Sequence, residues 1–139
     1  MRRSVGSNRS AYLVGLGFIG AGIAHFVRPD VYEAIMPRWV PYRVAVHRSA
    51  GVAEIVLGVG MFFGRTRSTA ARGLVWLLVL VFPANVDMAV NKVGFRHGDD
   101  RQLIRRQGAP VGIRNWMRLP LQFVLIGWVR RHAGRPVRS

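Results

Sequence analysis

Four stretches of the chain are nearly free of charged residues, and the charges gather between them: residues 11–27, 49–64, 73–90 and 112–129. The second stretch carries only Glu54 and the third only Asp87, whereas Arg114 and Arg118 lie near the start of the fourth. A helix that crosses a bilayer core needs roughly 20 apolar residues, with a lower limit of about 17. The pattern therefore predicts four such helices, the second of them extended back to Val44.

The polarity around each stretch indicates the surroundings of the helix. A helix at the surface of a soluble protein shows a polar face at the 3.6-residue period, but residues 11–27 and 73–90 are apolar on all sides. We therefore expect an all-α integral membrane protein, a four-helix transmembrane bundle, rather than a soluble bundle. A signal peptide is the alternative for the first stretch, because Arg2 and Arg3 precede it and small residues follow at Gly22–Ala24.

Composition adds a second constraint. Half of the residues are hydrophobic, yet the net charge is +15, from 21 Lys and Arg against 6 Asp and Glu, and no cysteine is present. Disulfides, thiolate metal sites and cysteine nucleophiles are therefore excluded. We expect a basic N-terminal tail (1–10), a membrane domain (11–129) and a basic C-terminal tail (130–139). The basic residues are spread over every loop, which disfavours nucleic acid as a partner and favours the lipid bilayer.

The loops divide Lys and Arg almost evenly between the two sides of a membrane, ten with the termini and eleven opposite. Four spans place both termini on one side, taken here as the cytoplasmic side, but the positive-inside comparison is tied. In the first loop Val31–Met36 predicts a short turn at the interface, and residues 91–111 predict a long polar loop. Ser10 is a candidate helix N-cap.

Gly15, Gly17 and Gly20 fit the dinucleotide fingerprint GxGxxG. That fingerprint has meaning only after a strand in a βαβ unit, and here it lies within an apolar helix. We expect these glycines to allow close helix packing in lipid instead.

Polar residues inside the predicted spans share helix faces with glycines. At helical spacing, His25 lies on one face with Gly15, Phe18 and Gly22, and Glu54 lies on one face with His47, Gly51 and Gly58. The two faces are expected to meet, bringing His25 towards Glu54 or His47. In the third span Asn85 is expected to face the bundle centre and Asp87 to lie near Lys92 at the membrane edge.

A polar group at membrane depth needs a partner. We therefore expect a polar cluster near one end of the bundle, formed by His25, Glu54, Asn85, Arg118 and Gln122. It could bind a quinone-like head group or relay protons; alternatively it is structural, with Glu54 paired to Arg118 and the others bonded between helices. No catalytic residue is assigned, and a metal site is disfavoured because no H-x-x-H or H-E-x-x-H spacing exists.

The chain resembles the DoxX-like family of small bacterial membrane proteins from about Tyr12 to Val129. The resemblance rests on these motifs: Gly20-Ala-Gly22-x-x-His25-Phe26-x-x-Pro29, Met36-Pro37, Val40-Pro41, Ser49-Ala-Gly51-x-x-Glu54, Phe82-Pro83-Ala84-Asn85-x-x-Met88-Ala89 and Arg118-Leu119-Pro120-Leu121-Gln122. It implies a four-helix bundle in the bacterial cytoplasmic membrane and a polar signature at the five residues of the cluster.

The resemblance implies a membrane subunit of a redox complex, with a quinone as cofactor and a redox protein as partner, rather than a stand-alone enzyme. A scaffold or assembly factor that uses the third loop, Arg96 to Arg114, is the alternative. A third hypothesis is a small proton-coupled transporter that uses His25 and Glu54.

Overall fold

The computed structural model describes residues 5–91, 94–97, 103–106 and 113–134. They form five helices and two strands: α1 (Val5–Val27), α2 (Pro29–Ile35), α3 (Arg43–Gly60), α4 (Arg67–Val90), β1 (Gly94–His97), β2 (Leu103–Arg106) and α5 (Arg114–Arg130). The four long helices confirm the all-α prediction. The antiparallel hairpin β1–β2, with Gly94 opposite Arg106, was missed, because the loop was read from its turn residues alone.

The helix ends differ from those predicted. Helix α1 begins at Val5, so the expected boundary of the N-terminal tail at residue 10 falls inside a helix and Ser10 is not an N-cap. Helix α3 begins at Arg43, one residue before the start at Val44 that was expected from the length needed to cross a bilayer. Helix α2 replaces the predicted short turn, with Pro29 in its first turn, where the missing N–H needs no partner.

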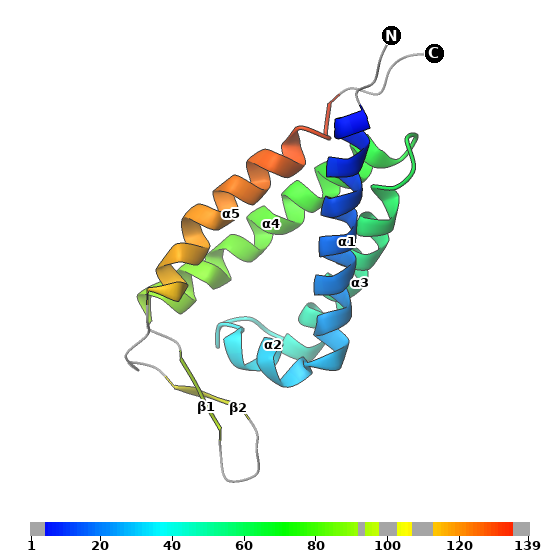
Figure 1. Cartoon of the computed structure of the whole chain (residues 1–139). Helices are drawn as coiled ribbons and strands as arrows, with labels where there is room; N and C mark the ends of the chain where they lie inside the picture. Colours follow the sequence, from blue (N-terminus) through cyan, green and yellow to red (C-terminus); the bar gives the residue numbers. More distant parts are fainter. Residues whose placement is uncertain (1–4, 92–93, 98–102, 107–112, 135–139) are drawn as a thin grey trace.

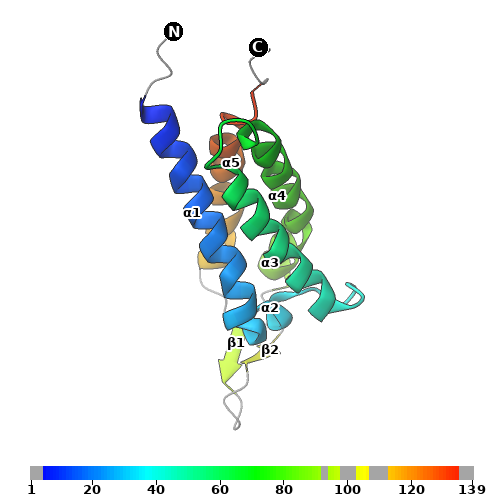
Figure 2. The same ribbon diagram turned by 90° about the vertical axis from the view of Figure 1, so that its right-hand side faces the viewer.

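Successive long helices run antiparallel and pack as two pairs (Figures 1 and 2). Helix α1 packs chiefly on α3, and α4 packs on α5, while the contact between α3 and α4 joins the pairs. The pairs converge where α1 begins and diverge towards α2 and the hairpin (Figure 1).

The apolar core occupies the end where the pairs converge. Residues from α1, α4, α5 and the turn after α3 form it: Ala11, Val14, Phe18, Met61, Ala70, Ala71, Leu74 and Val129. Hydrogen bonds join the first part of α1 to the last part of α5 and the residues after it, since Ser10 Oγ lies 3.1 Å from His132 Nε2 and accepts from Trp128 Nε1 at 2.7 Å. The start of α1 and the end of α5 therefore lie together.

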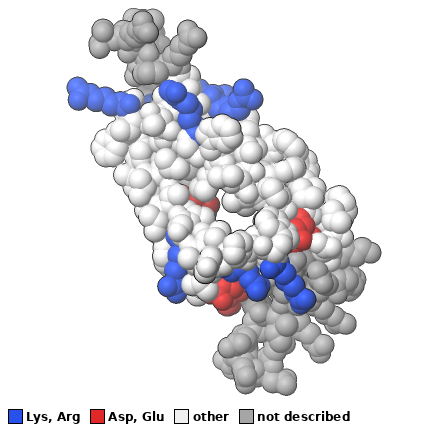
Figure 3. All heavy atoms as spheres, turned by 180° about the vertical axis from the view of Figure 1, so that it is seen from behind, with Lys and Arg blue, Asp and Glu red and all other residues white. Residues whose placement is uncertain are grey.

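Large apolar side chains cover the outer surfaces of the long helices, among them Leu16, Val56, Leu80 and Phe123, each at least 59 % exposed. Lys and Arg gather towards the two ends of the molecule, and the broad band between them is mostly uncharged, with small patches of Asp and Glu (Figure 3). Within the described residues, two helices are long and apolar enough to cross a membrane: Asn8–Val27 in α1 and α4. Only 33 % and 17 % of their apolar windows are buried.

Candidate functional site

The α1–α3 contact is built on glycines that face each other in pairs. A Cβ on Gly22 would lie 2.6 Å from the carbonyl oxygen of Gly51, and one on Gly15 would lie 2.7 Å from that of Gly58. Real Cβ atoms do not approach backbone so closely, so only glycine permits this spacing. The two faces expected from helical offsets do meet, and His25 lies against Gly51 at this contact.

The expected packing role of the GxGxxG glycines is correct only for Gly15. A Cβ on Gly17 or Gly20 would meet no atom within 4 Å. These two residues point away from α3, because they lie on other faces of α1 than Gly15 and Gly22.

His25 and Glu54 meet where the glycines bring the two helices together. His25 Nε2 lies 3.5 Å from Glu54 Oε2, and the two side chains are 10 % and 14 % exposed. The two side chains can meet across the interface because the glycines bring the backbones of α1 and α3 close together.

Helix α2 closes this cluster from the end of the bundle. The Tyr32 ring stacks on His25 with centroids 3.6 Å apart, and its hydroxyl donates to the Ala21 carbonyl oxygen at 3.4 Å. Glu33 Oε1 lies 3.6 Å from Nε2 of His47, whose side chain is fully buried. Burial and the nearby charge of Glu54 raise the pKa of Tyr32, which keeps its proton at neutral pH.

The first polar cluster thus comprises His25, Tyr32, Glu33, His47 and Glu54. Sequence reasoning found His25 and Glu54 and left His47 unassigned, but it missed Tyr32 and Glu33. The signal that could have found them is Pro29, which is suited to the first turn of a helix. Tyr32 and Glu33 follow it within one short helix.

Several buried polar atoms of this cluster have no hydrogen-bond partner within the described part of the chain. They are His25 Nδ1, both ring nitrogens of His47, and Glu54 Oε2. Glu54 Oε2 lies 3.5 Å from His25, and His47 Nε2 lies 3.6 Å from Glu33. These distances are compatible with charge attraction but do not give hydrogen bonds. Buried polar groups normally find partners, so these atoms are available to a ligand or to water.

A second polar cluster joins α4 to α5. Asn85 Nδ2 donates to Gln122 Oε1 at 2.6 Å, and Gln122 Nε2 donates to the Leu78 carbonyl oxygen at 2.6 Å. Asn115 Nδ2 donates to the Met88 carbonyl oxygen at 3.2 Å. Asn85 therefore faces α5.

The five predicted site residues do not form one cluster. Glu54 is not paired with Arg118 as the structural alternative required: its ionic contact is with His25, while Arg118 lies 3.6 Å from Met88 Sδ. No hydrogen bond or ion pair joins Glu54 to a described side chain of α5. Asp87 accepts from Asn91 Nδ2 at 2.6 Å, and Lys92 lies outside the described residues.

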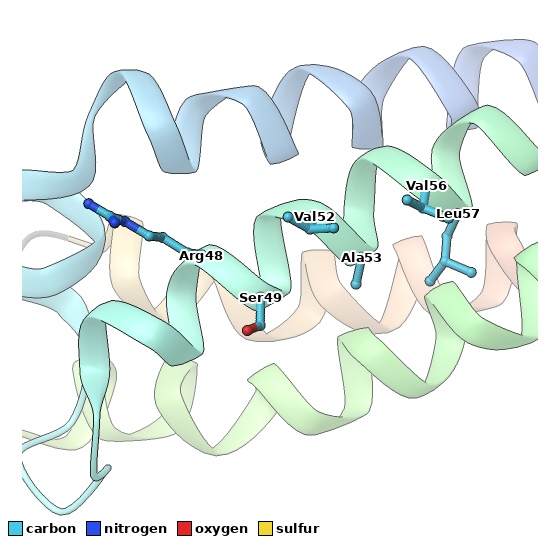
Figure 4. A pocket seen from close by; sticks show the side chains of 6 residues that line it. All are labelled: Arg48, Ser49, Val52, Ala53, Val56 and Leu57. Carbon is cyan, nitrogen blue, oxygen red and sulfur yellow. The ribbon is translucent and has the colours of Figure 1, made fainter.

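An open groove of about 600 Å³ runs along the other side of α3. Arg48, Ser49, Val52, Ala53, Val56 and Leu57 line it (Figure 4), and Leu57 lies directly against Gly73 of α4. The groove is apolar apart from Arg48 and Ser49, and its residues lie on different helix positions from the Glu54 face. It is therefore separate from the first polar cluster.

No set of three or more His, Asp or Glu residues in the described segments is arranged to hold a metal ion. The fold and its two clusters define a helical protein with polar groups held between apolar helices.

Residues 14–133 match a family described as a domain of unknown function, DUF8561. The chain belongs to this family, and the match covers α1 from Val14 onward and all of α2 to α5. Neither the curated proteins nor the solved structures contain a match.

Proposed function

We propose that the protein is a four-helix integral membrane protein whose long helices all lie in the bilayer. The outward-facing Leu, Val and Phe residues of α1, α3, α4 and α5 support this, because a soluble protein rarely exposes so large an apolar patch. Helix α3 carries Glu54 against α1, and Arg43 and Arg48 near its start suit the membrane boundary. The resemblance to DoxX-like proteins supports the same bundle in the bacterial cytoplasmic membrane.

We further propose that the first polar cluster binds the head group of a lipophilic small molecule of the quinone type. The observation that carries this is the set of buried atoms on His25, His47 and Glu54 that make no hydrogen bond within the described residues. Imidazole and carboxyl groups can donate to, or accept from, the oxygens of such a head group. An opening in the space-filled surface has acidic atoms at its edge (Figure 3), which gives a ligand a way in from the lipid.

Binding of a short-chain benzoquinone to the protein in nanodiscs tests this proposal. We expect Glu54→Gln to weaken binding at least tenfold while the protein still inserts and accumulates. Asp87→Asn is the matched control, because Asp87 lies on α4 and is bonded to Asn91; its binding should equal that of the wild type. Equal binding by the wild type and Glu54→Gln would exclude this site.

Quinone binding would make the chain a subunit of a redox complex rather than a stand-alone enzyme. Purification in mild detergent, followed by mass spectrometry of bound lipids and proteins, is the direct measurement. A co-purified quinone together with a redox protein supports the subunit role.

A scaffold is the second candidate, and the hairpin is the observation that favours it. Strands β1 and β2 project from the end of the bundle beyond α2 (Figure 1), where a partner protein can reach them. Replacing residues 94–106 with a short glycine-serine linker should then abolish partner recovery, while Glu54→Gln should leave it intact. The opposite pattern would favour the ligand site.

A further inference from the structure

A line of four titratable side chains leads from the surface of α2 into the α1–α3 contact. Glu33, 46 % exposed, lies 3.6 Å from fully buried His47. The rings of His47 and His25 are stacked, with centroids 5.9 Å apart. His25 in turn lies 3.5 Å from Glu54. Carboxylate, imidazole, imidazole and carboxylate thus follow one another from solvent to the interior.

We propose that Glu33, His47 and His25 form a proton route between water at the α2 end and Glu54. Each imidazole can accept a proton on one nitrogen and release the proton on the other. Chains of His and acidic residues within membrane helices often serve as proton relays. The route deepens the proposed function, because it assigns proton exchange with water to the same site that would hold the ligand.

The two outer steps are short and the middle step needs a bridge. The contacts of Glu33 with His47 and of His25 with Glu54, at 3.6 and 3.5 Å, are longer than a hydrogen bond. In ligand-free structures such contacts are often long and tighten when transfer occurs. Between the imidazoles, His25 Nδ1 and His47 Nδ1 have no hydrogen bond within the described residues, so one water molecule can join them.

The proton balance closes at each step. A proton from Glu33 enters His47 at Nε2, and the proton on His47 Nδ1 leaves through the water to His25 Nδ1. The proton on His25 Nε2 then passes to Glu54 Oε2. Rotation or tautomer exchange of the two rings restores the starting state, and transfer in the other direction reverses every step.

The other polar groups near this line do not carry the proton. Tyr32, stacked on His25, keeps its hydroxyl on the Ala21 carbonyl oxygen. Arg28 and Asp30 pair with each other at 3.4 Å on the surface. Arg48 lines the groove on another face of α3. Among the described residues, Glu33 is therefore the entrance to the route on the surface of α2.

Infrared spectroscopy after a rapid pH jump, on ligand-free protein in nanodiscs, measures the rate at which Glu54 gains its proton. The carbonyl band of protonated Glu54 is identified by its loss in Glu54→Gln. We expect His47→Phe to slow the growth of that band at least tenfold and to leave its final amplitude unchanged. Glu33→Gln should slow it several-fold, and Asp30→Asn, a carboxylate on the same helix, should leave it unchanged.

An unchanged rate in folded His47→Phe would overturn the route, since a purely structural His47 affects stability but not the rate. If that variant does not fold, Glu33→Gln decides, because Glu33 is at the surface; an unchanged rate there also overturns the proposal. The infrared experiment uses ligand-free protein, so its result does not depend on quinone binding. Failure of quinone binding would count against the proposed function alone. A normal protonation rate in these variants would count against the proton route alone.

Discussion

Gln122 carries the polar link between α4 and α5 at the scale of single residues. It is 5 % exposed, accepts from Asn85 and donates to the Leu78 carbonyl oxygen. We expect Gln122→Leu to lower the free energy of unfolding by about 1–3 kcal/mol, because it leaves the Asn85 amide without its acceptor. Unfolding in mixed micelles, followed by circular dichroism, measures the change.

The double variant Asn85→Leu/Gln122→Leu is the control for that pair. Replacing both partners with apolar groups removes the unsatisfied amide, so the double variant should be more stable than Gln122→Leu alone. A double variant less stable than either single variant would show that the hydrogen bond is not the source of the loss.

His132 gives the protein a pH dependence outside the membrane-spanning helices. Burial, with the charges of Arg67 and Arg131, lowers its pKa from 6.5 in the folded state. The unfolded chain therefore binds more protons at His132 than the folded one in the pH range between the folded pKa and 6.5. This contribution to stability is fully present above pH 6.5 and is lost as the pH falls through the folded pKa.

We therefore expect the melting temperature of His132→Asn to fall less than that of the wild type as the pH decreases from 7 towards 5. Thermal melting in detergent across this range compares the two proteins. Parallel pH curves would contradict the assignment.

At this scale the sequence predicted His25, Glu54, Asn85 and Gln122 as interhelical residues, because each lies on a helix face that offsets of three and four identify. The pairing of Glu54 with Arg118 was wrong, since offsets within one helix give no information on how far apart two helices lie. Glu33 and Tyr32 were missed because their segment was taken as a loop turn.

At the scale of the helix, the glycine contact determines how closely and how stably α1 packs on α3. A Cβ on Gly22 would collide with the Gly51 carbonyl oxygen, so Gly22→Ala should lower the free energy of unfolding by about 1–3 kcal/mol. Gly20→Ala is the matched control two positions away, in open space. It should be neutral or stabilise the helix by up to about 1 kcal/mol.

Melting of both variants under identical detergent conditions provides the measurement. Equal losses for Gly22→Ala and Gly20→Ala would mean that the α1–α3 spacing is looser than the glycine geometry indicates.

The hydrophobic pattern predicted the four long helices and the need for α3 to start before residue 49. It placed the starts of α1 and α4 too late, because Arg9 and Arg67 were treated as loop residues although both lie in helical backbone. Arg67 bonds the Met61 carbonyl oxygen and Asn8 instead. A charged residue within the first turns ends an apolar run without ending the helix.

The whole molecule has its apolar core at one end and its first polar cluster at the other. Antiparallel helices and the joined chain ends lead to a simple expectation for sidedness. In sealed vesicles, Gly64→Cys and Gly134→Cys should react with an impermeant maleimide from the same side, and Arg38→Cys from the opposite side. Val79→Cys, 44 % exposed on α4, should be shielded by lipid on both sides.

The native chain contains no cysteine, so every signal in that experiment comes from the introduced residue. Labelling of Gly64→Cys and Arg38→Cys from one side would rule out the four-span arrangement. Charge counting could not settle the sidedness, since the loops carry nearly equal numbers of basic residues.

The start of α1, the α3–α4 turn and the end of α5 all meet at the core end, where Arg67 bonds Asn8 at 2.6 Å and Ser10 contacts His132. A peptide linker could therefore close the original termini while new ones open within residues 62–66. Such a circular permutant would keep every helix in its orientation and both new ends on the original side. The order in which helices emerge during synthesis is thus separable from the architecture that they reach.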